Sequence, residues 1–198
     1  EGRTYKEDVK AARKGMNALM GPIRLEQERL KQGHRPRWNP RLVLTLGNHE
    51  ERIDRAIEYD RKLDGLISTK DLGYEAHGWE VHPFLEVVVI DGVAYSHYFT
   101  SGVMGRPVTS AQMLLTKKHM SCFAGHQQGR MIAYGRRADG KEMTAIIAGS
   151  CYEHDEGYMG PQGNEHWRGF YMLHEVKDGA FDEMAVSLNY LRERYGKR

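Results

Sequence analysis

The chain has 198 residues, of which 40% are apolar and 28% charged, and its formal net charge is only +2. This composition suits a folded domain with a sizeable core and excludes a disordered chain. A duplex-binding protein usually carries a larger basic excess, so we expect nucleic acid as a substrate only. No apolar run approaches the roughly 18 residues that a membrane span needs, so we expect no membrane partner.

Two cysteines cannot build a disulfide framework, and no signal peptide is visible, so we expect a cytoplasmic protein. The chain shows no linker or repeat, which predicts one domain over residues 1–198. It begins Glu1-Gly2-Arg3 without an initiator methionine, so we expect a processed protein or a fragment. Nothing in the composition points to a particular oligomeric state.

The first third of the chain is predicted to be mainly helical. Apolar residues recur at intervals of three, four or seven from Thr4 to about Lys31, and Gly21-Pro22 within this stretch predicts a kink or two shorter helices. The apolar run Leu42–Leu46 predicts a strand, and its lack of alternation indicates a sheet covered on both faces. Two further helices are expected, over His49–Lys62 and around Leu63–Leu72.

From Trp79 the apolar period changes to two, which is typical of strands. The predicted strands are Glu80–Phe84, Leu85–Ile90, Val93–Phe99, Cys122–Ala124, Arg130–Arg136, Glu142–Ala148, Phe170–Val176 and Phe181–Leu188. Hairpin turns are expected at three Asp-Gly pairs, Asp91-Gly92, Asp139-Gly140 and Asp178-Gly179. A helix is expected over Ala111–Lys118 with Thr109 or Ser110 as its N-cap. The elements together predict one α/β or α+β domain.

Three predicted strands end in residues that bind metals. Gly47-Asn48-His49-Glu50 follows the first, His97 lies in the strand from Val93, and Gly125-His126 follows Cys122–Ala124. Sites in α/β sheets form at the carboxyl ends of strands, so Asn48, His97 and His126 are candidates to share one cation. Mixed oxygen and imidazole ligands suit Mn, Fe, Ni or Zn better than Ca or Mg.

These motifs resemble the calcineurin-like metallophosphoesterases. The resemblance is carried by Gly47-Asn48-His49-Glu50 with Arg52, then His97, then Gly125-His126-Gln127-Gln128, and it extends over residues 42–176. It implies two facing β-sheets flanked by helices, here lacking the first strands. It also implies metal-dependent hydrolysis of a phosphoester, with two ions in the complete site and manganese as the expected metal.

The resemblance assigns a role to each matching residue. Asn48, His97, His126 and Gln128 correspond to metal ligands, although the family usually has histidine at the position of Gln128. His49 corresponds to the residue that orients the phosphoryl group and protonates the leaving oxygen. Arg52 is assigned to substrate binding at the edge of the site. The alternative is that Arg52 forms a salt bridge within its helix.

The chain departs from the family pattern in one further respect. No Asp-x-His and no Gly-Asp occurs in it, although both motifs should precede Gly47. We therefore expect the chain to begin downstream of the second motif and to be a poor hydrolase by itself. The alternative is a degenerate, non-catalytic module of the same fold that binds metal or phosphate, and a second is that the tetrapeptide is accidental.

The candidate site residues also have purely structural interpretations. Asn48 would cap the helix that follows it, His97 would be a hydrogen-bonded strand residue, and Gln128 a polar loop residue. Cys151 and His154 show no complete triad or zinc spacing, so we expect no nucleophilic or zinc chemistry there. The segment from Tyr152 to Trp167 is expected to be either a substrate-facing loop or a plain connection.

Overall fold

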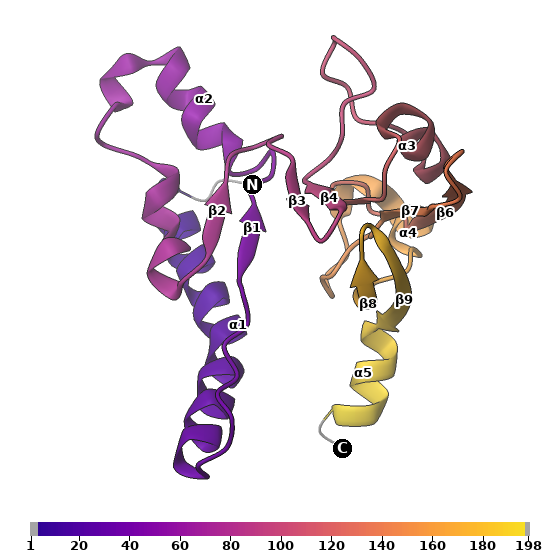
Figure 1. The fold of residues 1–198 in the computed structure, drawn as a ribbon. Helices are drawn as coiled ribbons and strands as arrows, with labels where there is room; N and C mark the ends of the chain where they lie inside the picture. The colour runs from indigo at the N-terminus through magenta and orange to yellow at the C-terminus, as the bar shows by residue number, and fades with distance from the viewer. Residues whose placement is uncertain (1–3, 197–198) are drawn as a thin grey trace. The chain divides into compact units, whose positions relative to one another are not determined.

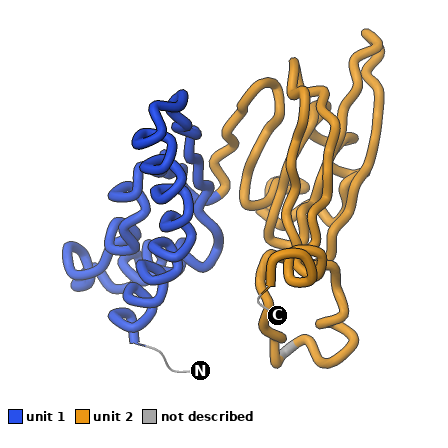
Figure 2. The backbone as a smooth tube through the Cα atoms, turned by 90° about the horizontal axis from the view of Figure 1, so that it is seen from below, with its two compact units in different colours: residues 1–84 blue, residues 85–198 orange. Residues whose placement is uncertain are grey.

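A computed structural model of the chain describes residues 4–196 and divides the chain into two units, Glu1–Phe84 and Leu85–Arg198 (Figure 2). The helices and several sheets confirm the mixed α+β class (Figure 1). Among the described residues, no helix combines the length and the apolar character that crossing a bilayer requires.

The first unit is built on one long helix, α1, Tyr5–Gln32. It begins with a capping box, in which the Thr4 hydroxyl accepts a hydrogen bond from the Glu7 amide and the Glu7 carboxylate accepts one from the Thr4 amide. The helix continues through Pro22, so the alternative of two shorter helices is wrong, whereas the alternative of a kink stays a prediction. Pro22 removes one backbone donor, and the neighbouring turns of this long helix tolerate that loss.

The remaining elements of the first unit are short. They are β1 Val43–Thr45, α2 Glu51–Tyr59, the 3-10 helices η1 Arg61–Leu63, η2 Thr69–Leu72 and η3 Glu75–His77, and β2 Glu80–His82. The second expected helix, Leu63–Leu72, is therefore wrong as a single element. Strand β1 pairs in parallel with β2 in a two-stranded sheet, and its residues are half-buried. The expectation of a sheet covered on both faces does not hold for the described part of this unit.

The second unit contains a mixed five-stranded sheet with the order β3-β4-β5-β7-β6. Its elements are β3 Val88–Ile90, β4 Val93–Ser96, α3 Ala111–Lys118, β5 Cys122–Ala124, β6 Met131–Arg136 and β7 Glu142–Ile147. Strands β4, β5 and β7 run parallel, so their carboxyl ends meet at one edge. The Ser110 hydroxyl caps α3 by accepting from the Met113 amide, which confirms the predicted helix and one of its two candidate caps.

The C-terminal part of this unit adds η4 Gly157–Met159, α4 Gly160–Asn164, the hairpin β8 Gly169–Lys177 with β9 Ala180–Ser187, and α5 Leu188–Tyr195. Helix α3 packs on one face of the five-stranded sheet, where Leu114, Leu115 and the fully buried Cys122 form part of the core. The β8–β9 hairpin lies on the other face. There the Phe123 and Tyr171 rings meet edge to face with centroids 5.8 Å apart, and the Tyr134 hydroxyl donates a hydrogen bond to the Glu183 carboxylate. The second unit thus has three layers.

The hairpin turns at Asp91-Gly92 and Asp178-Gly179 pack against each other. The Gly179 amide donates to the Asp91 carbonyl at 2.8 Å, and both residues of each turn have positive φ, as a two-residue hairpin requires. A Cβ added at Gly92 would lie 2.4 Å from the Gly179 nitrogen. Glycine is therefore required at position 92 both for the turn and for this contact.

We expect Gly92→Ala to destabilise the fold far more than Gly140→Ala. Both glycines have φ near +85°, but a Cβ at Gly140 meets nothing within 4 Å. Gly140→Ala should cost about 1 kcal/mol of unfolding free energy for the backbone alone, and Gly92→Ala roughly 1–3 kcal/mol more for the steric conflict. Urea unfolding of the two variants measures the difference. Equal losses would show that the two turns do not press on each other in solution.

Candidate functional site

His97 and His126 follow two neighbouring parallel strands at the same edge of the sheet. Strand β4 ends at Ser96, which is in register with Ala124, the last residue of β5. The Gly125 amide then donates to the His97 carbonyl at 3.0 Å, which extends the pairing beyond both strands. The sequence thus places the two histidines together through the length of the strands and the glycine that follows one of them.

The two imidazole rings are in direct contact. The Nε2 atom of His97 lies 3.1 Å from the Nδ1 atom of His126, and the rings meet edge to face with centroids 5.0 Å apart. Two nitrogens that bind the same cation, each at about 2.1 Å, lie about 3.0–3.4 Å from each other in tetrahedral or octahedral geometry. The spacing of this pair therefore fits two ligands of one ion. It fits equally a hydrogen bond in which one neutral ring donates to the other.

The backbone at His126 adopts a conformation that is unusual for a side chain other than glycine. Its φ is +65°, in the left-handed region. The next residue holds it there, because the Gln127 amide donates to the Gly125 carbonyl at 2.8 Å and its side chain donates to the Val108 carbonyl at 2.5 Å. Strained backbone of this kind persists only where neighbouring bonds enforce it. Gln127, which the sequence had not singled out, is thus a positioning residue for His126.

Tyr98 is a second residue that the sequence did not indicate. Its ring centroid lies 4.9 Å from that of His126, and its hydroxyl donates to the Gly105 carbonyl at 3.1 Å. The side chain therefore connects the histidine pair to the loop between Ser101 and Arg106. The only available signal in the sequence was its position next to His97.

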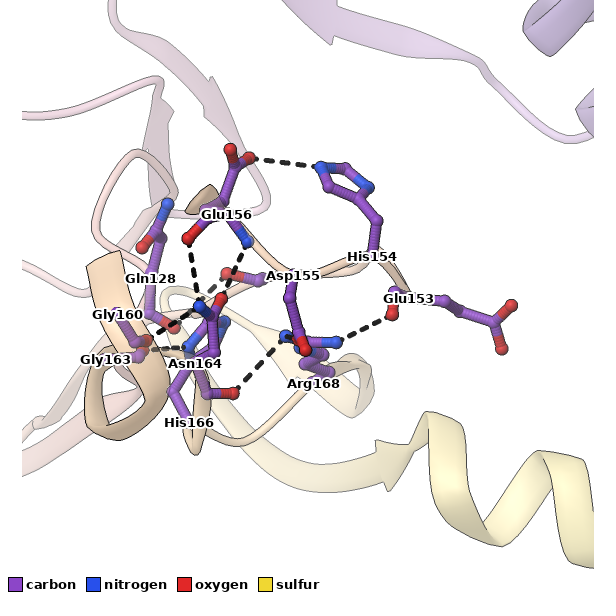
Figure 3. Close-up of polar contacts among 11 residues, drawn as sticks. Gln128, Glu153, His154, Asp155, Glu156, Gly160, Gly163, Asn164, His166 and Arg168 are labelled. Atoms are coloured by element: carbon purple, nitrogen blue, oxygen red, sulfur yellow. Dashed lines mark hydrogen bonds and ion pairs between the residues drawn. The ribbon is translucent and has the colours of Figure 1, made fainter. Parts of the chain in front are cut away.

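Gln128 lies at the edge of the segment that follows. Its backbone carbonyl accepts from the Ser150 hydroxyl at 3.4 Å, and the residue is half-buried (Figure 3). These contacts hold its main chain beside the end of β7. The role of its side-chain amide as a metal ligand stays a prediction.

The Gly47–Glu50 turn belongs to the first unit and leads from β1 into α2. The Leu46 amide donates to the His82 carbonyl at 2.9 Å, and the Glu51 amide donates to the Gly47 carbonyl at 3.1 Å. Between these bonds, the Glu50 carboxylate accepts from the Gly47 amide at 2.9 Å. This bond closes the turn that leads into α2, whose N-cap residue is Glu50 and which has no side-chain cap. Closing the turn therefore gives the glutamate of the tetrapeptide a structural explanation.

Glu50 also faces the hydroxyl of Tyr74 at 3.4 Å. Burial of the phenol and the nearby carboxylate together raise the pKa of Tyr74 to about 12. Glu50 is thus engaged by both the Gly47 amide and the Tyr74 hydroxyl. His49 is exposed, and Asn48 is half-buried.

We expect Glu50→Gln to lower the pKa of Tyr74 toward 10 without reaching it, because the negative charge is removed and the burial stays. A raised tyrosine pKa stabilises the fold fully below pH 10, and this contribution is lost as the pH rises to about 12. The variant should therefore lose less stability over this interval than the wild type. Titration of the Tyr74 ring by NMR, with Tyr190 as reference, measures the shift. An unchanged Tyr74 pKa would show that Glu50 does not act on the phenol.

His49 and Arg52 line one cavity of the first unit. The role of Arg52 in substrate binding stays a prediction. Asn48 lies in the first unit and the histidine pair in the second, so the convergence of the three stays a prediction. Within residues 4–196, no three His, Cys, Asp or Glu side chains gather in a group that could hold a metal ion. The predicted ligand set contains only two such residues and adds amides, so it is a neutral set.

The segment after Cys151 is fastened by its own side chains (Figure 3). The Asn164 amide bonds the backbone of Glu156 at 2.8 and 3.0 Å, and Arg168 bonds the Glu153 carbonyl and the Asp155 carboxylate. Burial raises the pKa of the Cys151 thiol, which disfavours the nucleophilic thiolate. The absence of cysteine chemistry here stays a prediction.

Comparison of the chain with protein-family models, with curated proteins and with solved structures found no match.

Proposed function

We propose that the protein is a metal-dependent phosphoester hydrolase of the metallophosphoesterase type. The observation that supports it most is the contact between His97 and His126 at the carboxyl ends of β4 and β5. These histidines follow Gly47-Asn48-His49-Glu50 in the order that the resemblance requires. The finer architecture of that family, two facing sheets flanked by helices without the first strands, belongs to the same proposal. So does its location in the cytoplasm.

The donor atoms suit a transition metal. Imidazole nitrogens bind Mn, Fe, Ni or Zn, and the 3.1 Å spacing of the His97 and His126 nitrogens matches two ligands of one ion. Asn48 would add an amide oxygen, and Gln128 a second, weaker one. A bound pair of ions would supply a hydroxide nucleophile near neutral pH and offset the charge of the phosphoryl oxygens.

The chain's own residues then divide the remaining tasks. His49 holds the proton that the leaving oxygen takes up, and the turn fixed by Glu50 keeps His49 next to Asn48. Arg52, one helical turn further on, attracts the anionic ester. Gln127 keeps His126 in its strained conformation, in which its Nδ1 atom meets His97.

The alternative is a non-catalytic module that binds metal or phosphate. The specific observation that favours it is the lack of Asp-x-His and Gly-Asp motifs in residues 1–198. The recognised ligands are neutral, so they offset none of the cation's charge. A second ion needs carboxylates that these motifs would provide.

Turnover of bis(4-nitrophenyl) phosphate with Mn²⁺ distinguishes the two functions. The 198-residue chain should be slow, and a version preceded by the Asp-x-His and Gly-Asp motifs, taken from the coding sequence upstream of Glu1, should be much faster. Equal turnover of the two versions would contradict the two-ion proposal. Mn²⁺ binding without turnover in either version would favour the non-catalytic module.

A further inference from the structure

A cavity of about 620 Å³ lies in the first unit beside the Gly47–Glu50 turn. Helix α1 contributes Asp8, Val9 and Ala12 to its lining, and α2 contributes Arg52 and Ile53. His49 lines the same cavity. The lining is thus mixed: an apolar wall, which Ile67 and Leu72 extend, faces polar groups that include the Glu50 carboxylate and the Tyr74 hydroxyl.

Cavities that bind small organic molecules have this character. They measure about 300–1,000 Å³ and combine apolar walls with a few polar groups that fix the orientation of the ligand. Inorganic phosphate would gain nothing from the apolar wall formed by Val9, Ala12 and Ile53. A ligand with both an anionic end and an apolar body uses the whole lining.

We propose that this cavity binds the leaving group of the phosphoester, an alcohol with an aromatic or bulky aliphatic body. The proposal rests on the proposed function, in which His49 protonates the leaving oxygen. During hydrolysis the hydroxide oxygen bonds to phosphorus, the bond from phosphorus to the ester oxygen breaks, and the proton of His49 passes to that oxygen. The alcohol therefore begins at His49, and the cavity that His49 lines is where its body lies.

The charges in the lining refine the substrate class. Arg52 attracts the phosphoryl end of the ester, whereas the carboxylates of Asp8 and Glu50 repel a second anionic group, and Asp8 accepts a hydrogen bond from a hydroxyl or amine. The cavity therefore favours substrates with one phosphoryl group on a neutral or donor-bearing organic body. Substrates with a small leaving group, such as methyl phosphate, leave the apolar wall unused.

Two neighbouring alanines provide a matched test. Ala12 lines the cavity, whereas Ala11 is exposed on the same helix. The affinities of 1-naphthyl phosphate and methyl phosphate are measured by calorimetry on the full chain with Mn²⁺. The wild type and Ala11→Trp should prefer the naphthyl ester by at least about tenfold, and Ala12→Trp should lose most of that preference. Ala56→Phe fills the cavity from α2 and repeats the test if Ala12→Trp fails to fold.

Each outcome decides the proposal. Equal affinities in the wild type would overturn it, and so would an undiminished preference when the cavity is filled in a folded variant. An equal loss in Ala11→Trp would also overturn it, because the effect would then not come from the cavity. A preference of the expected kind, with no Mn²⁺-dependent turnover in either version of the chain, would contradict the proposed function and leave the binding cavity supported.

Discussion

His49→Ala is expected to lower turnover by about 10²–10⁴, the usual contribution of general acid catalysis. The measurement is the Mn²⁺-dependent rate on an aryl phosphodiester in the version that carries the two aspartate motifs. The metal content should stay nearly unchanged, because in the proposed mechanism the imidazole of His49 protonates the leaving oxygen and binds no ion. The exposed His174→Ala on β8 provides the control and should keep full turnover.

The pattern of the losses distinguishes the possible roles of His49. A loss of activity together with a loss of bound metal would make His49 a ligand. An unchanged rate would remove it from the mechanism. Substrates with activated leaving groups should be affected less, because a 4-nitrophenolate needs less help from a proton than an alkoxide does.

His97→Ala and His126→Ala are each expected to lower the affinity for Mn²⁺ by at least about tenfold. Even groups that only orient a ligand change affinity by about 10–100-fold, so loss of a ligand should do at least as much. Since the two nitrogens are 3.1 Å apart, the double variant should bind little more weakly than either single variant. Titration calorimetry of the three variants and His174→Ala measures this.

One result would contradict the metal site. Unchanged Mn²⁺ affinity in His97→Ala, with the fold intact, would mean that the contact between the rings is a hydrogen bond within the protein. The left-handed backbone at His126 would then serve only to place its ring for this hydrogen bond and not to bind a metal. The proposal of a metal site at this edge of the sheet would fail.

Local features of the sequence predicted the second unit better than the first. The Asp-Gly pairs carry their own turn geometry, and Ser110 caps α3 by a bond three residues away, so these elements need no distant partner. The strand within Leu42–Leu46 is confirmed, but the burial of its sheet and the single helix over Leu63–Leu72 were predicted wrongly, because burial and helix length depend on tertiary packing. Helix α1 continues through Pro22 because a helix of 28 residues with capped ends tolerates the loss of one backbone hydrogen bond.

The candidate site divides in a similar way. Parallel neighbours and a glycine after β5 were sufficient to predict that His97 and His126 share one edge. The contributions of Gln127 and Tyr98 were not predictable, because they depend on the Val108 and Gly105 carbonyls, which come from other loops. The bond from the Gly47 amide to the Glu50 carboxylate was not predicted, because the motif favoured a different interpretation of Glu50.

We propose that Asn48, His97 and His126 bind one cation, and one NMR measurement tests this most directly. Substoichiometric Mn²⁺ broadens the NMR signals of groups close to it, so the side-chain amide of Asn48 and the ring signals of the two histidines report on it directly. The proposal predicts that all three broaden together at the same low Mn²⁺ concentration, while His174 stays sharp. Broadening of the two histidines with an unaffected Asn48 amide would contradict the shared site.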